Sequence, residues 1–448
     1  MKKLLSLTLI FALMSSGLVA CKQRGESVGS SDLSMQGNQA NIEFPTVLPS
    51  GKQIITLATL YEESVRGPVA HFNMTNPDYH IQVMDYGQYN TSYEDDTGLR
   101  KLNTEIISGI VPDILHIFEY GMPYRLYLSR GLLADLYPFI DNDTEYSRDD
   151  FVEGVFRATE VDGGLYCIFS GFTISSVAGH PAVLGPSIGW NRDEFRAVID
   201  AHPEADVPFG TRFTNINFVT ESVTFEIDRY IDWETGGAHF DTDSFLHLLE
   251  YANALPAEYS TEIDTNELIA VGRQIMARTT FHDFYDYRYY KTMFGGEIVL
   301  KGYPTTNRNG NTLTGSVPFA IPAASKNKDG AWEFLKMLLD KDRQLDSIYA
   351  QGFPTNKAAF DRVVEDAMKS DLDSYYDYGF ELQPLTHADV EYILTVVSGS
   401  EISNLMMGAE AYNIVRENVI DYFNGYRSAE ETAKIIQSRV LIFIAERS

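Results

Sequence analysis

The chain has 448 residues, 44% of them hydrophobic, and carries 35 basic against 63 acidic side chains, a formal net charge of −28. That length favours two domains or lobes, and that apolar content excludes a wholly disordered chain. The negative charge repels nucleic-acid phosphates and anionic lipid headgroups, which argues against electrostatic binding to either. Two cysteines, Cys21 and Cys167, are too few for a disulfide scaffold or a thiolate metal site, and we expect neither metal nor cofactor.

The first 20 residues have the three parts of a secretory signal. Lys2 and Lys3 form a positive start, residues 4–14 an apolar run, and residues 15–20 a small-residue exit. The apolar run is too short to span a bilayer of roughly 30 Å as a helix. The exit ends in Leu18-Val19-Ala20-Cys21, which resembles the bacterial lipoprotein signal and implies lipidation of Cys21. An ordinary signal peptide whose cleavage site happens to precede a cysteine is the alternative.

Residues 21–50 form the next segment. They are rich in Gly, Ser, Gln and Asn with little apolar periodicity, which predicts a flexible tether. A lipid anchor and a tether would hold the chain outside the cell, at the outer face of the bacterial cytoplasmic membrane. Cys167, between Tyr166 and Ile168 in an apolar run, is expected to be a buried small hydrophobe and not a nucleophile.

The first part of the globular chain alternates strands and helices. Residues 53–60, 81–84 and 114–118 are apolar runs that predict buried strands. Between them, apolar residues recur at helical spacing over residues 65–72 and 99–106. This order predicts an α/β fold with a parallel sheet that is covered on both faces.

Polar and aromatic residues stand directly after two of these strands. Tyr61 and Glu62 follow the first strand, and Glu119 and Tyr120 follow the third. Ligands of parallel sheets bind beyond the carboxyl ends of the strands, so these four residues lie where a ligand is expected.

Capping patterns mark several later helices. Asn191-x-x-Glu194 and Ser428-x-x-Glu431 have the spacing of capping boxes. Asp329 precedes apolar residues at helical spacing over residues 331–338. Each pattern predicts a helix that begins at that point.

The sequence contains none of the common catalytic motifs. It has no Gly-x-Ser-x-Gly elbow, His-Glu-x-x-His zinc helix, Gly-x-x-x-x-Gly-Lys phosphate loop or Gly-x-Gly-x-x-Gly turn. Asp141-x-Asp143-x-Glu145 is superficially similar to a calcium loop, but Tyr146 stands where the turn needs Gly and Val152 where a Glu ligand is needed. We interpret it as a solvated acidic turn. Carboxylates are too abundant for their presence to assign any pair as glycosidase acid and nucleophile, so we name no catalytic residue. We expect a protein that is not an enzyme.

Residues 282–290 interleave aromatic rings with charged side chains. Aromatic faces cover the apolar C–H face of a sugar, and charged side chains bind its hydroxyls, so the segment predicts a carbohydrate-binding surface. Period-two alternation from Phe284 to Tyr290 equally predicts an ordinary strand with its rings inward. Both interpretations stay open.

Several short stretches together resemble successive landmarks of the bacterial extracellular solute-binding proteins of family 1. They are Val111–Leu115, Gly131–Leu136, Asp162–Tyr166, Gly189–Phe195, Asp232–Gly236, Gly302–Pro304, Ser316–Ile321, Ala331–Leu335 and Gly352–Lys357. No single stretch is specific, but their order over residues 50–448 is, and the pattern is most similar to the Clostridia-type lipoproteins of the family. The resemblance implies two α/β lobes joined by hinge strands, a ligand cleft between the lobes, and delivery of a solute, most often an oligosaccharide, to the permease of an ABC importer.

The resemblance also implies lobe boundaries. With hinge crossings at Tyr166–Ile168 and Val317–Phe319, lobe one comprises residues 51–165 and 315–360, and lobe two residues 166–314 and 361–448.

Site residues follow from the resemblance by analogy with the sugar binders of the family. The cleft would draw on Tyr61, Glu62, Glu119, Tyr120, Glu221, Phe281, Tyr285 and Tyr287. Those sugar binders often carry a stacking Trp, whereas Trp332 is expected in the core and Trp190 and Trp233 in structural positions. Stacking is therefore expected from Tyr.

The sequence supports a monomeric binding protein with a carbohydrate ligand, a permease partner, a lipid as its only attachment to the membrane, and no nucleic acid. Two alternatives remain, a lipid-anchored extracellular glycoside hydrolase and the same fold presenting its ligand to a sensor kinase.

Overall fold

The structure is a computed structural model. It describes residues 46–91, 96–117, 122–210, 213–233, 235–258, 265–346, 352–369, 381–402 and 409–447. The predicted signal peptide, the lipidation site Cys21, most of the tether, and the candidate residues Glu119 and Tyr120 lie outside the described residues. Residues 45–448 form one compact unit.

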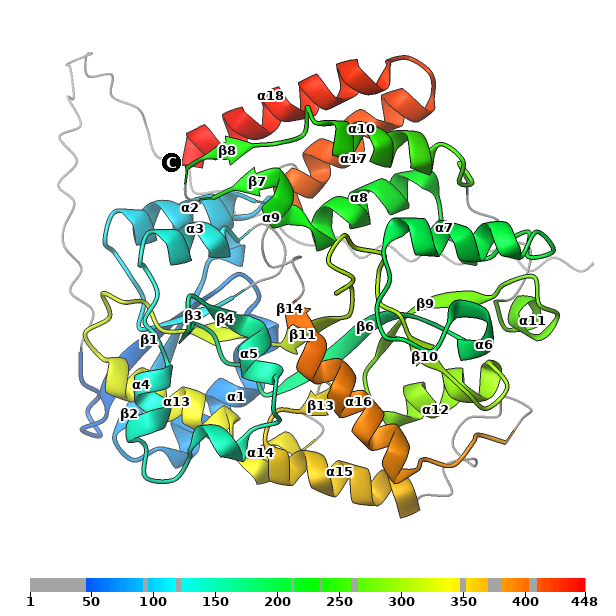
Figure 1. Cartoon of the computed structure of the whole chain (residues 1–448). Helices are drawn as coiled ribbons and strands as arrows, with labels where there is room; N and C mark the ends of the chain where they lie inside the picture. The colour runs from blue at the N-terminus through cyan, green and yellow to red at the C-terminus, as the bar shows by residue number, and fades with distance from the viewer. Residues whose placement is uncertain are drawn as a thin grey trace, which may run out of the picture. The chain divides into compact units, whose positions relative to one another are not determined.

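The first sheet has the strand order β12-β3-β1-β2 (Figure 1). Its strands are β1 (Gln53–Thr59), β2 (Tyr79–Asp85), β3 (Ile114–His116) and β12 (Phe319–Ala320). β1 is parallel to β2 and β3, and β12 is antiparallel to β3. The predicted strands and the two helices between them, α1 (Glu62–Thr75) and α2 (Thr97–Ile107), are confirmed. So is the helix after Asp329, although α13 (Lys328–Leu338) begins one residue earlier.

The second sheet is built around β6 (Gly171–Gly179), with the order β10-β6-β11-β14 and with β9 and β13 also paired to β6. The other strands are β9 (Met276–Phe281), β10 (Val299–Leu300), β11 (Thr312–Ser316), β13 (Phe353–Pro354) and β14 (Glu401–Ile402). All neighbours of β6 run antiparallel to it, although none of them is adjacent to it in the sequence.

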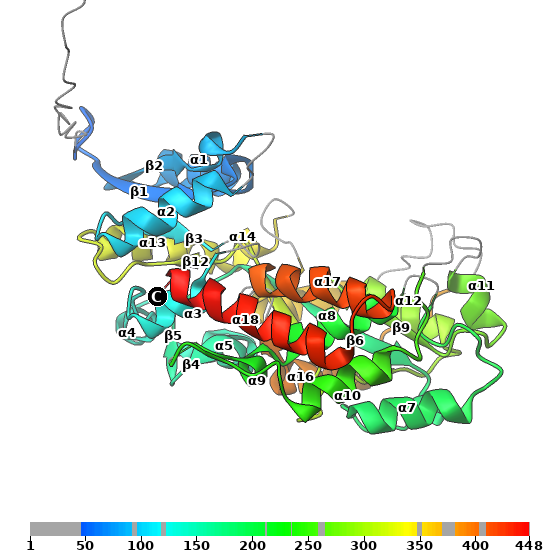
Figure 2. The same cartoon turned by 90° about the horizontal axis from the view of Figure 1, so that it is seen from above.

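Helices cover both faces of the second sheet (Figure 1). One face carries α7 (Arg192–Ala201), α8 (Asn215–Phe225), α10 (Asp243–Ala252), α17 (Ala409–Phe423) and α18 (Ala429–Arg447). The other carries α12 (Phe284–Met293), α15 (Lys357–Lys369) and α16 (His387–Gly399). Figure 2 shows α17 and α18 side by side. Both capping boxes predicted for this region are present, at Asn191–Glu194 and at Ser428–Glu431.

Short elements complete the described chain. The helices are α3 (Tyr124–Ser129), α4 (Tyr137–Asn142), α5 (Val155–Thr159), α6 (Pro181–Leu184), α9 (Ile227–Tyr230), α11 (Thr265–Ala270) and α14 (Lys341–Gln344), with single 3₁₀ turns at Gly87–Tyr89 and Arg148–Asp150. Two small hairpins pair β4 (Glu160–Val161) with β5 (Gly164–Leu165) and β7 (Ile231–Asp232) with β8 (Gly237–Ala238).

Two of the segments that connect the sheets pair with each other. Ile168 and Phe319 exchange backbone hydrogen bonds of 2.8 and 2.9 Å. Val317, two residues before Phe319, has φ +47°, an uncommon value for a β-branched residue that marks a sharp change of direction. These are the segments that the sequence suggested as hinge crossings. The lobe boundaries themselves stay a prediction, and β13, which they assign to lobe one, pairs with β6 in the second sheet.

The expectation of a strand at Phe284–Tyr290 is wrong. The segment is helix α12, and the Asp283 side chain caps it by accepting a hydrogen bond of 2.9 Å from the Asp286 backbone N–H. Phe284 and Tyr287, three residues apart, share the buried face. The rings of so short a run fit a period of two and a helical period equally, and the cap decides for the helix.

The three tryptophans are placed as expected where they are described. Trp332 lies on α13 in the core, and Trp190 is buried with its indole N–H donating to the Gly302 carbonyl over 2.8 Å. Trp233 follows β7 in the turn before β8 and packs against the hydrophobic cluster that contains Tyr230 and Phe240.

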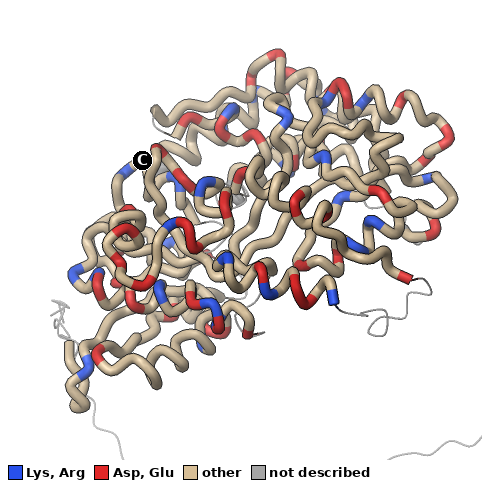
Figure 3. The backbone as a smooth tube through the Cα atoms, turned by 60° about the horizontal axis from the view of Figure 1, so that its bottom comes forward, with Lys and Arg blue, Asp and Glu red and all other residues tan. Residues whose placement is uncertain are grey.

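Acidic residues are spread along the whole described chain (Figure 3). Among the helices that the structure describes, none is both long and apolar enough to cross a membrane. Within the same residues, no group of three or more His, Cys, Asp or Glu side chains is arranged to hold a metal ion.

Candidate functional site

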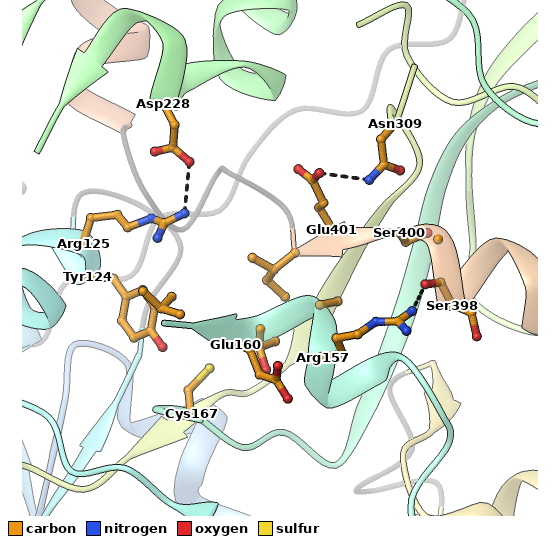
Figure 4. Close-up of a pocket in the computed structure, with 15 residues that line it drawn as sticks. Tyr124, Arg125, Arg157, Glu160, Cys167, Asp228, Asn309, Ser398, Ser400 and Glu401 are labelled. Atoms are coloured by element: carbon orange, nitrogen blue, oxygen red, sulfur yellow. Dashed lines mark hydrogen bonds and ion pairs between the residues drawn. The ribbon is translucent and has the colours of Figure 1, made fainter. Parts of the chain in front are cut away.

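A cavity of about 540 Å³ lies where residues from six parts of the chain meet (Figure 4). Its walls come from α3, from the segment Arg157–Val161 at the end of α5 and in β4, from α9, from Asn309, and from the segment Ser398–Ile402 between α16 and β14. Cys167, in the segment that connects the two sheets, also lines it. The cavity therefore adjoins the connection between the two sheets.

Three polar contacts cross this cavity. Arg125 on α3 forms an ion pair of 3.0 Å with Asp228 on α9. The Asn309 side-chain amide donates to Glu401 over 2.9 Å, and the Arg157 guanidinium donates to the Ser398 carbonyl. The lining thus offers carboxylate, carbonyl and amide acceptors next to guanidinium donors. Figure 4 shows these pairs around the open space.

The base of the cavity is less polar. Tyr124 and Cys167 are both buried, and burial raises the pKa of the Cys167 thiol to about 11. The thiol therefore stays protonated at neutral pH and supplies no thiolate. This confirms the interpretation of Cys167 as a buried small hydrophobe.

Tyr61 and Glu62 lie at the start of α1, after the first strand as predicted. The Tyr61 backbone N–H donates to the Thr59 hydroxyl over 3.0 Å, and the Tyr61 side chain is exposed. Neither residue lines the cavity. The structure thus places both at the strand end but away from the described pocket.

Glu221 lies on α8 and pairs with Arg278 on β9. Burial raises the pKa of Glu221 to about 7, because the loss of hydration outweighs the attraction of Arg278. The other carboxylate oxygen of Glu221 is buried and has no hydrogen-bond partner among the described residues. Glu221 is therefore a buried acceptor next to a half-exposed guanidinium.

The aromatic candidates separate into core and surface. Phe281 is 1% exposed and Tyr287 is 2% exposed, and the Tyr287 hydroxyl donates to Asp389 over 3.0 Å. In this conformation neither ring reaches solvent. Tyr285 lies on α12 and is partly exposed. The six described candidates therefore lie in three separate places and none of them lines the cavity.

Sequence reasoning missed the residues of the cavity. Arg125 and Asp228 are 103 positions apart, and neither stands in a motif. Only the folded chain brings them together. A local signal existed for Tyr287, since its spacing from Phe284 is that of a helical face.

Comparison with known proteins shows the fold. No family model matches the chain, and no curated protein matches it. The sugar-binding protein MalE from Xanthomonas citri superposes with a TM-score of 0.56 at 14% identity, over 88% of this chain and 98% of its own. A proposed oligosaccharide periplasmic-binding protein from a Synechococcus species gives a TM-score of 0.54 at 16% identity, over 88% and 99%. An extracellular solute-binding protein of family 1 from Alicyclobacillus acidocaldarius gives 0.50 at 14% identity, over 88% and 98%.

These likenesses cover most of this chain and nearly the whole of each neighbour. They confirm the predicted α/β fold of the two-lobed periplasmic binding proteins. The neighbours include MalE-like sugar-binding proteins and a family 1 solute-binding protein, as the sequence suggested.

Proposed function

We propose that this chain is a substrate-binding protein of an ABC importer that captures a carbohydrate and delivers it to a permease. The observation that carries the proposal is the likeness to the Xanthomonas sugar-binding protein over 88% of this chain. The binding site lies between the two lobes, and an oligosaccharide is the proposed ligand. The protein acts as a monomer and leaves its ligand chemically unchanged.

The polar lining of the cavity supports a neutral ligand with hydroxyl groups. Acidic side chains outnumber basic ones there, which disfavours an anion. Arg125 and Asp228 already form an ion pair with each other, so neither needs a charged ligand as its counter-ion. Sugar hydroxyls both donate and accept hydrogen bonds and so fit a lining with both kinds of group.

Thermal-shift screening of the full chain against a carbohydrate library tests ligand class. A ligand that binds only the folded state raises the melting temperature by mass action. We expect at least one sugar to do so in a concentration-dependent way. Amino acids screened in parallel are the control, and a shift by an amino acid with none by any sugar would contradict the proposal.

The glycoside hydrolase alternative is tested by the release of reducing sugar. The protein is incubated with the sugars that raise its melting temperature, and a known glycosidase serves as the positive control. We expect each sugar to be recovered intact. Sustained release of reducing ends would establish the hydrolase instead.

Lipid anchoring at Cys21 is part of the proposal, supported by the lipoprotein-like signal and the tether sequence that follows it. Cys21→Ala should release the protein from the membrane fraction. Cys167→Ala is the matched control, since Cys167 is the only other cysteine, and it should leave fractionation unchanged. Membrane retention of the Cys21→Ala protein would exclude a lipid anchor at this residue.

Uptake separates the importer from the sensor-kinase alternative. Deletion of the gene should abolish import of a radiolabelled sugar that binds the protein. Normal import with a lost transcriptional response would assign the protein to a sensor.

A further inference from the structure

One face of the second sheet carries a strip of hydroxyl groups. In the register of this sheet, Ser175 on β6 pairs with Thr280 on β9, and Thr173 on β6 pairs with Thr314 on β11. Paired residues of neighbouring strands point to the same face, and so do residues two apart in one strand. The four side chains therefore share one face across three adjacent strands.

Burial follows this alternation. Thr173, Ser175, Thr280 and Thr314 are all partly exposed, whereas Phe172 and Ile174, which point to the opposite face, are fully buried. β6 is an interior strand with partners on both sides, in a sheet that has helices on both faces. A partly open row of hydroxyls in that position marks a gap between the helices that the structure describes on this face.

Helix α8 covers the neighbouring part of the same face. Val177, two residues beyond Ser175, is buried in the cluster that contains Phe218 and Val219 of α8. The open strip therefore begins where the apolar contact with α8 ends.

Glu221 and Arg278 lie at that border. Arg278 pairs with Val177 in the register, so its side chain points to the same face as the hydroxyl strip. Glu221 on α8 holds its guanidinium, which remains 55% exposed. The second carboxylate oxygen of Glu221 is buried and has no hydrogen-bond partner among the described residues. Such an acceptor is costly to leave unpaired, which points to a donor that the described residues do not supply.

The strip also approaches the cavity. Thr312 pairs with both Ser175 and Glu401 in the register, which places the Glu401 side chain on the face of the strip. Glu401 also lines the cavity. Glu401 therefore lies on the face of the strip and also in the lining of the cavity.

We propose that the strip of Thr173, Ser175, Thr280 and Thr314 is a ligand-binding floor for an uncharged polyhydroxylated compound, with Glu221 and Arg278 at its border. The inference rests on the proposed function and deepens it. Hydroxyl side chains donate and accept hydrogen bonds, and the floor contributes no aromatic ring. It therefore recognises hydroxyl groups and does not require the apolar face that a stacked sugar needs, so monosaccharides and open-chain sugar alcohols fit the same floor.

The test is calorimetric titration of the full chain and its variants with a library of neutral sugars and sugar alcohols that contains glucose, maltose, sorbitol and myo-inositol, together with glucuronate. The double variant Thr173→Val/Thr314→Val removes two hydroxyl groups and keeps the shape of both side chains and their β-strand propensity. Thr279→Val is the matched control, because Thr279 points to the opposite face of β9. Thr280→Val is the second variant if the double variant fails to fold.

We expect the neutral compounds that bind the wild type to bind the double variant about tenfold more weakly or worse. The Thr279→Val control should keep the wild-type Kd within about twofold, in line with the precision of such comparisons. Unchanged affinity in both strip variants would overturn the floor while leaving carbohydrate capture in place. Binding of glucuronate alone would overturn the uncharged class. Failure of the wild type to bind any carbohydrate would overturn the proposed function, and the floor with it.

Discussion

The Arg125 guanidinium lies 3.0 Å from a carboxylate oxygen of Asp228, and this ion pair joins α3 to α9. α3 is the first helix after strand β3 of the first sheet, and α9 follows directly after α8, which packs on the second sheet. The pair therefore ties together the two sides of the cavity that both residues line. The strength of this ion pair contributes to how tightly the two sides of the cavity are held together.

Arg125→Gln and Asp228→Asn test that pair in a double-mutant cycle. Because Asp228 is more than half exposed, we expect a coupling energy of only about 0.2–1 kcal/mol, and less at high salt. Urea unfolding of the four proteins measures it. Arg196 and Asp200, paired within α7 over 2.8 Å, provide a comparison that crosses no cavity. A coupling of zero at low salt would show that the Arg125–Asp228 pair contributes nothing to the free energy of unfolding.

Glu221→Gln should change how stability depends on pH. Because burial raises the pKa of Glu221 from 4.5 to about 7, the folded state binds this proton more tightly than the unfolded state between these values. The contribution of Glu221 to stability is therefore largest at low pH and falls as pH rises towards 7. Gln does not titrate, so the variant should gain stability relative to wild type over this range, by up to an order of 3 kcal/mol.

The measurement is urea unfolding of both proteins across that range. His116 has the opposite slope, because burial lowers its pKa from 6.5 to about 4 and protonation then favours the unfolded state as pH falls. Only the difference in the free energy of unfolding between the variant and the wild type isolates the contribution of Glu221. A difference that stays constant with pH would show that the pKa of Glu221 is not raised.

Gly154→Ala should destabilise the protein more than Gly131→Ala. Both glycines have positive φ, +89° and +63°, so Ala costs about 1–2 kcal/mol at either position. At Gly154 the new Cβ would also lie 2.7 Å from the Cα of Ser398, whereas nothing lies within 4 Å at Gly131. Overpacking adds about 1–3 kcal/mol at Gly154. Equal losses in thermal unfolding would show that α5 and the end of α16 are not in close contact.

Tyr287→Phe should lower stability without changing carbohydrate affinity. The hydroxyl donates to Asp389, which also pairs with Lys291 over 2.8 Å, so its removal costs about 1–2 kcal/mol. The ring is buried and meets no solvent in this conformation. Thermal unfolding and calorimetric titration measure the two quantities. Lost binding at an unchanged melting temperature would return Tyr287 to the ligand site.

Local signals in the sequence were sufficient for several strands and helices but not for the site. The strands at 53–60 and 114–118 and the capping box at Asn191 depend on neighbours in the chain, and the structure contains all three. The strand expected at Phe284–Tyr290 was wrong because a short aromatic run fits both the strand and the helix period. Only the Asp283 cap distinguishes the helix from the strand.

Site residues come from distant segments. The hydroxyl strip requires the register between β6, β9 and β11, which no local pattern contains. Glu221 was a sequence candidate, but its pairing with Arg278, 57 positions away, and the burial that shifts its pKa arise only when α8 packs on the sheet.

Calorimetric titration of the full chain with neutral carbohydrates, followed by recovery and chemical analysis of the bound compound, tests the central claim most directly. The account predicts saturable binding at a single site per chain, with the carbohydrate recovered unchanged. Absence of binding by every carbohydrate, or conversion of the bound compound to a product, would contradict it.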